Sequence, residues 1–143
     1  MIAELATDLQ TKIKSIASGK LGTTPVRVGL AAGATSIDPF MEKVQLPAVW
    51  VVYVGDVQPD PDPLGKCGAT VVAQFVVKVL LEYKNEKDMV DNQYPLLREI
   101  ANQVNGQMGP PGAMRWKYTG QTLDELTGNR MVFDQQFSIV SRM

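Results

Sequence analysis

The segment PAVWVVYVG, residues 47–55, decides the fold class of this 143-residue chain. β-Branched and aromatic side chains fill the segment almost without interruption, which is typical of a β-strand. Apolar residues occupy both alternating sets of positions. We therefore expect a central strand whose two faces are both covered.

A second and longer strand is predicted over Ala69–Tyr83. One alternating set of its side chains is apolar from Val71 to Leu81, and we expect this set to face the core. The other set includes Lys78 and other polar residues, which predicts a sheet face that meets solvent or a partner subunit. We expect this strand to form a long hairpin with Pro47–Val57.

Two amphipathic helices are predicted from apolar residues spaced three and four apart. The first covers residues 2–17. The second follows LEYKNEKD, with Asp88 or Asp91 as the candidate N-cap, and ends at Asn105 and Gly106. Its expected buried stripe consists of Val90, Tyr94, Leu97, Ala101 and Val104.

The C-terminal third of the chain predicts further strands. Met114–Thr119 and Gln121–Leu126 are β-like segments, and we expect a turn near Gly120 to separate them. The last strand is expected over Arg130–Ser141, where Gln135 interrupts an apolar stripe.

This order of elements predicts an α+β fold: one mainly antiparallel β-sheet with two α-helices packed on one face. Pro25–Leu30 is a candidate for one more short strand. The length fits a single domain spanning residues 1–143, because ordinary domains contain roughly 100–200 residues.

The composition argues against most catalytic chemistry. The chain has no histidine and one cysteine, so it lacks Ser-His and Cys-His pairs and a His/Cys zinc cluster. Its net charge is −1, without a basic block for nucleic acid. Early acidic residues and short apolar runs predict a protein without a signal peptide or membrane span, made in a reducing cytoplasm. We expect no catalytic residue, cofactor or metal.

Three polar features have ordinary structural interpretations. Cys67 has no histidine to act as its base, so we expect a thiol at the end of a loop. Asp56, Asp60 and Asp62 could offer carboxylate oxygens to calcium, but their segment has neither the glycine turn nor the distal glutamate of a calcium loop, so we expect a solvated acidic loop. Asp124 and Glu125 are neighbours on a predicted strand and should point to opposite faces.

The segment QPDPDPLGK, residues 58–66, is the first candidate for an interface. Three prolines fix φ and remove backbone donors, so we expect a stiff, polyproline-like excursion on the surface. A stiff loop loses less entropy when a partner fixes it. The predicted contact residues are Gln58, Pro59, Asp60, Pro61, Asp62 and Pro63.

The second candidate is the sequence RWK at residues 115–117. Alternation sends Trp116 to one face and both Arg115 and Lys117 to the other. We expect Trp116 to be an exposed or interfacial aromatic residue. Two cations are too few for a DNA-binding patch, so a protein partner is expected. Lys78, on the half-polar strand face, completes the candidate set.

The order of the segments resembles the tail terminator (tail completion) proteins of tailed bacteriophages, including the minor tail proteins of Mu-like phages. The residues that carry the likeness lie in LPAVWVVYVGD, AQFVVKVLLEY, LLREIANQVNG, WKYTGQTLDEL and RMVFDQQFSIV. The likeness covers nearly the whole chain. It consists of pattern and order, without an invariant chemical motif.

The resemblance implies a non-enzymatic virion protein that forms a homo-oligomeric ring, typically a hexamer. Such a ring caps the tail tube, ends its polymerisation and joins it to the head-tail connector, while DNA passes through without specific binding. It implies assembly in the host bacterial cytoplasm and a place at the head-proximal end of the tail. A head-tail connector or tail tube subunit, and a small metal- or carboxylate-dependent enzyme, are the alternatives.

Overall fold

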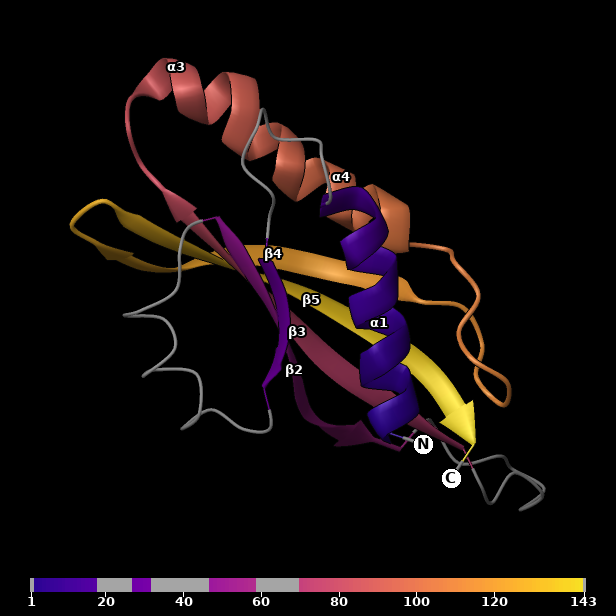
Figure 1. Cartoon of the computed structure of the whole chain (residues 1–143). Coiled ribbons are helices and arrows are strands. Elements are labelled where there is room, and N and C mark those ends of the chain that lie inside the picture. The colour runs from indigo at the N-terminus through magenta and orange to yellow at the C-terminus, as the bar shows by residue number, and fades with distance from the viewer. Residues whose placement is uncertain (1, 18–26, 32–46, 59–69, 143) are drawn as a thin grey trace.

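The computed structural model describes residues 2–17, 27–31, 47–58 and 70–142. It confirms the predicted α+β class: a mainly antiparallel sheet carries the helices on one face (Figure 1). The elements are α1 (Ile2–Ala17), β1 (Arg27–Ala31), β2 (Ala48–Val57), β3 (Thr70–Glu82), α3 (Glu86–Asp88), the π-helical turn η2 (Met89–Gln93), α4 (Tyr94–Val104), β4 (Lys117–Thr127) and β5 (Arg130–Arg142).

The five strands lie in the order β1-β2-β3-β5-β4. β1 confirms the short candidate strand and pairs in parallel with β2, whereas the other neighbouring strands are antiparallel. The predicted pairing of β2 with β3 is confirmed, and Trp50 lies opposite Lys78. β2 also has buried side chains on both of its faces. Val51 is buried beneath the helices, and Val52 is buried on the opposite side.

The predicted turn near Gly120 is wrong, because Lys117–Thr127 is one continuous strand. Its pairing with β5 shifts register between Tyr118 and Gly120, and again between Leu123 and Glu125. A β-bulge of this kind adds an unpaired residue and bends the strand without ending the ladder. The turn that does end β4 contains Gly128, whose φ of 58° favours glycine.

Asn85, rather than Asp88 or Asp91, caps the second helical segment. The Asn85 side chain accepts a 2.8 Å hydrogen bond from the backbone N–H of Asp88. Asp88 accepts side-chain hydrogen bonds from Asn92 at 2.8 Å and from Gln93 at 3.1 Å. These bonds favour the ionised carboxylate, so the pKa of Asp88 lies below its ordinary value.

The π-helical turn also changes which side chains of this segment point inward. Val90 and Tyr94 were predicted to be buried, yet both are exposed, while Met89 and Gln93 are buried instead. A π turn holds more residues than an α turn, so the apolar stripe rotates around the axis at η2. The rest of the predicted stripe, from Leu97 onward, faces the core.

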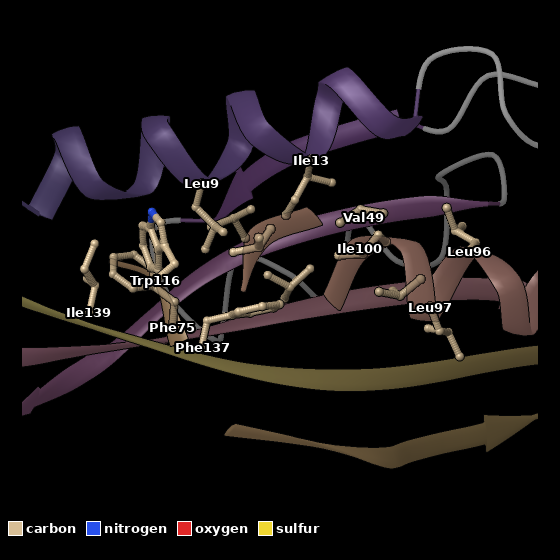
Figure 2. Packing of buried hydrophobic residues seen from close by; sticks show 14 of the residues in the cluster. Leu9, Ile13, Val49, Phe75, Leu96, Leu97, Ile100, Trp116, Phe137 and Ile139 are labelled. Atoms are coloured by element: carbon tan, nitrogen blue, oxygen red, sulfur yellow. The ribbon is translucent and has the colours of Figure 1, made fainter. Parts of the chain in front are cut away.

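The main core lies between the helices and the sheet (Figure 2). Both helices contribute an apolar stripe, and β2, β3 and β5 contribute alternating residues, as their periods require. The principal members are Leu5, Leu9, Ile13, Leu96, Leu97, Ile100, Val49, Phe75, Val77, Phe137, Ile139 and Trp116.

Candidate interaction surfaces

The proline-rich candidate is described only at its first residue. Gln58 follows β2 and is exposed. Pro59, Asp60, Pro61, Asp62 and Pro63 lie outside the described residues, as does Cys67. Their predicted contact with a partner stays a prediction.

Trp116 is not an exposed aromatic residue, and that expectation is wrong. Its side chain is 1% exposed, and its ring packs edge-on against Phe75 at a centroid distance of 5.5 Å. The preceding residues bring it there, because Ala113 bridges to Ser141 of β5 and the backbone N–H of Met114 donates to the carbonyl oxygen of Val140. Trp116 therefore belongs to the fold.

The two flanking cations point away from the core, as alternation predicts. Arg115 and Lys117 are exposed. The Nη1 atom of Arg115 donates a 2.8 Å hydrogen bond to the carbonyl oxygen of Gly106 and so closes the loop after α4. Lys117 begins β4 opposite Ser138, which places it on the sheet face that the helices leave uncovered. We call this the outer face.

Lys78 lies on the same outer face and forms ion pairs with two carboxylates. Its Nζ atom is 3.0 Å from Asp134 on β5 and 3.2 Å from Asp124 at the second bulge of β4. Burial alone would lower the pKa of Lys78. Hydrogen bonds and charge attraction, first from Asp134 and then from Asp124, outweigh burial and raise that pKa.

This three-residue cluster carries a net charge of −1. Burial raises the pKa of Asp134, and repulsion from Asp124 adds to the rise, although Lys78 opposes both. Two carboxylates share one ammonium group, so the cluster has spare acceptor capacity toward a cationic partner. The rest of the outer face around it mixes half-buried Val76 with half-buried Gln136 and exposed Gln74.

A groove runs between α4 and the edge strand β4, with a volume of about 590 Å³. We did not predict this groove from the sequence. Helix residues form one wall, strand residues form the other, and two tyrosines lie among them. The lining consists of Tyr94, Leu97, Arg98, Ala101, Asn102, Asn105, Tyr118 and Gln121.

Gln135 fixes the separation of the two groove walls. Its side chain is fully buried, and Nε2 donates to the carbonyl oxygen of Leu97 on α4 at 2.7 Å. The same atom donates to Oε1 of Gln121 on β4 at 2.8 Å. A second tie joins the walls at one end, where the backbone N–H of Tyr118 donates to Oδ1 of Asn105 at 3.0 Å. The groove is therefore built into the fold. Its one sequence signal was the polar Gln135 within an apolar stripe.

The carboxylates singled out in the sequence do not form a described site. Asp124 turns to Lys78, whereas Glu125 accepts a 2.9 Å hydrogen bond from the hydroxyl of Thr127. Within the described ranges, no three side chains of the metal-binding types come together. Among the described helices, none combines the length and apolar character needed to cross a membrane.

Comparison with known proteins supports the fold. No protein-family model matches the chain, and no curated protein matches it. A chain in the virion of a native gene transfer agent particle has a similar structure, with a TM-score of 0.65 and 13% sequence identity. The similarity covers 99% of this chain and 97% of that one, so it extends over the whole architecture.

Proposed function

We propose that this protein is a structural component of a phage-like virion. In this proposal it forms a ring that caps the tail tube, ends tube polymerisation and joins the tail to the head connector. The observation that carries the proposal is the end-to-end structural likeness to a virion chain of a gene transfer agent particle. The order of the sequence segments, which resembles tail terminators, supports the same class.

The surfaces of the chain suit a ring. A cyclic ring of more than two subunits needs two different, complementary patches on each subunit. The sheet has different edges, a parallel strand β1 and an antiparallel strand β4, and its outer face mixes polar and apolar residues. We assign the outer face around Lys78 and Lys117, together with Arg115 and the segment from Gln58 to Pro63, to contacts with other subunits or the tail tube.

The proposed ring is a hexamer at the head-proximal end of the tail, assembled in the cytoplasm of the host. Its protein partners are the tail tube protein and the head-tail connector. DNA passes through the ring without sequence-specific contacts, because the described outer face presents few cations, and Lys78 is already paired with carboxylates.

Native mass spectrometry at micromolar concentration, with and without the cognate tail tube protein, tests the proposal. The expected species is a closed ring, with six subunits. A strict monomer under all these conditions contradicts the proposal. Open-ended polymers formed by the chain alone would instead indicate a tube subunit, and rings that bind only connector protein would indicate a connector subunit.

A further inference from the structure

We infer that the groove between α4 and β4 receives the proline-rich segment, residues 58–63, of a second copy of this chain. The inference deepens the proposed function, on which it rests for the presence of a neighbouring subunit. It names both surfaces of one contact: the groove as receptor and the segment PDPDP as the ligand.

The chemistry of the groove fits a polyproline ligand. Proline-rich segments dock into aromatic-lined grooves, because proline rings pack on aromatic faces and the pre-set backbone loses little entropy. Tyr94 and Tyr118 supply aromatic surface, and the Tyr94 side chain is 47% exposed. Asn102 and Gln121 are exposed lining residues whose amide groups can donate to the free carbonyl groups of such a ligand.

The positive charge of the groove favours an acidic ligand. Arg98 is the one charged residue among the lining side chains, and it is exposed. It forms no ion pair with any residue in the described ranges. The segment from Gln58 to Pro63 carries Asp60 and Asp62 and no cation. A guanidinium group beside a carboxylate makes a strong, oriented hydrogen bond.

The strand register keeps most of the segment of the same chain out of the groove. The segment leaves from Val57 on β2, whereas Tyr118 and Gln121 of the groove lie three strands away on β4. Three strand spacings are about 14 Å, and the offset along the strands raises the separation from Val57 to about 17 Å at Tyr118 and about 22 Å at Gln121. From Val57, a fully extended chain reaches Asp60 within about 11 Å and Asp62 within about 18 Å. Within one chain only the last residues of the segment therefore reach the Tyr118 end of the groove. A segment that lies along the groove, with both aspartates in it, has to come from another copy.

A binding measurement on the full chain tests this contact. The receptor is a variant in which residues 59–63 are replaced by Gly-Ser-Gly-Ser-Gly, so that no segment of any receptor copy competes with the probe. The full chain with Asp60→Asn and Asp62→Asn is the second receptor, in case the first does not fold. The probe is a fluorescent peptide of residues 57–65, followed by anisotropy.

We expect saturable binding that Arg98→Glu weakens at least tenfold, while the control Arg142→Glu, at the exposed end of β5, changes it less than twofold. A peptide with Asp60→Lys and Asp62→Lys should bind the Arg98→Glu receptor better than the unchanged one. Three results overturn the inference: no saturable binding up to millimolar peptide, an equal loss of binding in both arginine variants, or no gain in binding when the charges are exchanged.

Because the measurement needs neither ring nor tube, its failure leaves the proposed function intact. A chain that binds the peptide but never forms rings contradicts the proposed function alone.

Discussion

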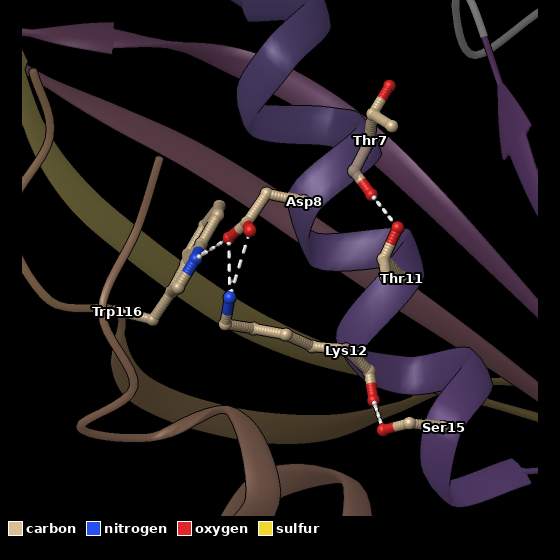
Figure 3. Close-up of polar contacts among 6 residues, drawn as sticks. All are labelled: Thr7, Asp8, Thr11, Lys12, Ser15 and Trp116. Atoms are coloured by element: carbon tan, nitrogen blue, oxygen red, sulfur yellow. Dashed lines mark hydrogen bonds and ion pairs between the residues drawn. The ribbon is translucent and has the colours of Figure 1, made fainter. Parts of the chain in front are cut away.

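The indole Nε1 of Trp116 donates a 2.8 Å hydrogen bond to Oδ2 of Asp8, and this bond ties α1 to the segment that leads into β4 (Figure 3). The two residues are 108 positions apart in the sequence. The Oδ2 atom of Asp8 also forms an ion pair with Nζ of Lys12, one helical turn later, at 2.9 Å. One carboxylate thus satisfies a buried donor and anchors the N-terminal helix on the sheet.

Replacement of Asp8 by alanine should lower the free energy of unfolding by about 1–3 kcal/mol, because the buried indole N–H loses its acceptor. Asp8→Asn should cost less, since its amide oxygen can still accept. Urea unfolding followed by tryptophan fluorescence measures both losses. Thr7→Ala, at an exposed position on the same helix, is the control. Equal stability of Asp8→Ala and Thr7→Ala would show that the tie contributes nothing.

Phe75→Ala should cost about 3–5 kcal/mol and yield largely insoluble protein, because it empties the centre of the core. Phe75 is 1% exposed and contacts both Tyr53 and Trp116 through its ring. Val76→Ala, the neighbouring residue on the half-buried outer face, is the matched control and should cost clearly less. The yield of soluble protein and the urea midpoint measure the difference. Similar losses in both variants would contradict the assignment of the two sheet faces.

The double variant Arg115→Ala with Lys117→Ala should separate interface from fold. Both side chains are exposed. Arg115 donates a hydrogen bond to the carbonyl oxygen of Gly106, and the double variant removes that bond. An exposed hydrogen bond contributes about 1 kcal/mol or less, so the melting temperature should fall by no more than about 4 °C. Assembly with tube or connector protein, followed by native mass, should fall strongly. Should the variant melt as early as Phe75→Ala, the two residues belong to the fold.

The helical segment around Asp88 should be sensitive to acid. The hydrogen bonds from Asn92 and then Gln93 hold the pKa of Asp88 below its ordinary value of 3.8. A depressed carboxylate pKa gives stability that is present above the unfolded-state pKa and is lost as the pH falls through the folded-state pKa. The stability difference between the wild type and Asp88→Asn should therefore be constant near neutrality and shrink below about pH 4.

Chemical unfolding of both proteins from pH 7 down to pH 2.5 measures that difference. Asn92→Ala removes the larger of the two causes and should show part of the same effect. A difference that is independent of pH would mean that the Asp88 hydrogen bonds do not form in solution.

Periodicity was enough to predict most of the fold. The stripe that includes Leu5 and Leu9 placed α1, and alternation about Phe75 placed the core face of β3. The errors occur where a local irregularity changes the period. At η2 the π-helical turn places Val90 and Tyr94 on the exposed side of the segment. At Gly120, where we predicted a turn, a bulge between Tyr118 and Gly120 lets β4 run on as one strand.

The interaction surfaces were harder to predict because they depend on contacts distant in sequence. Alternation separated Trp116 from its charged neighbours correctly, but only the packing against Phe75 and Asp8 decides which side faces the core. The groove likewise needs Gln135 to join α4 to β4, and no local pattern reports such a bridge.

Electron microscopy of tail tubes grown from the cognate tube protein, with this chain added and gold-labelled, tests the central claim most directly. The proposed function predicts one ring of label at a single end of each tube and tubes that stop lengthening once capped. Label distributed along the tubes, or tubes that lengthen equally with and without the chain, would contradict it.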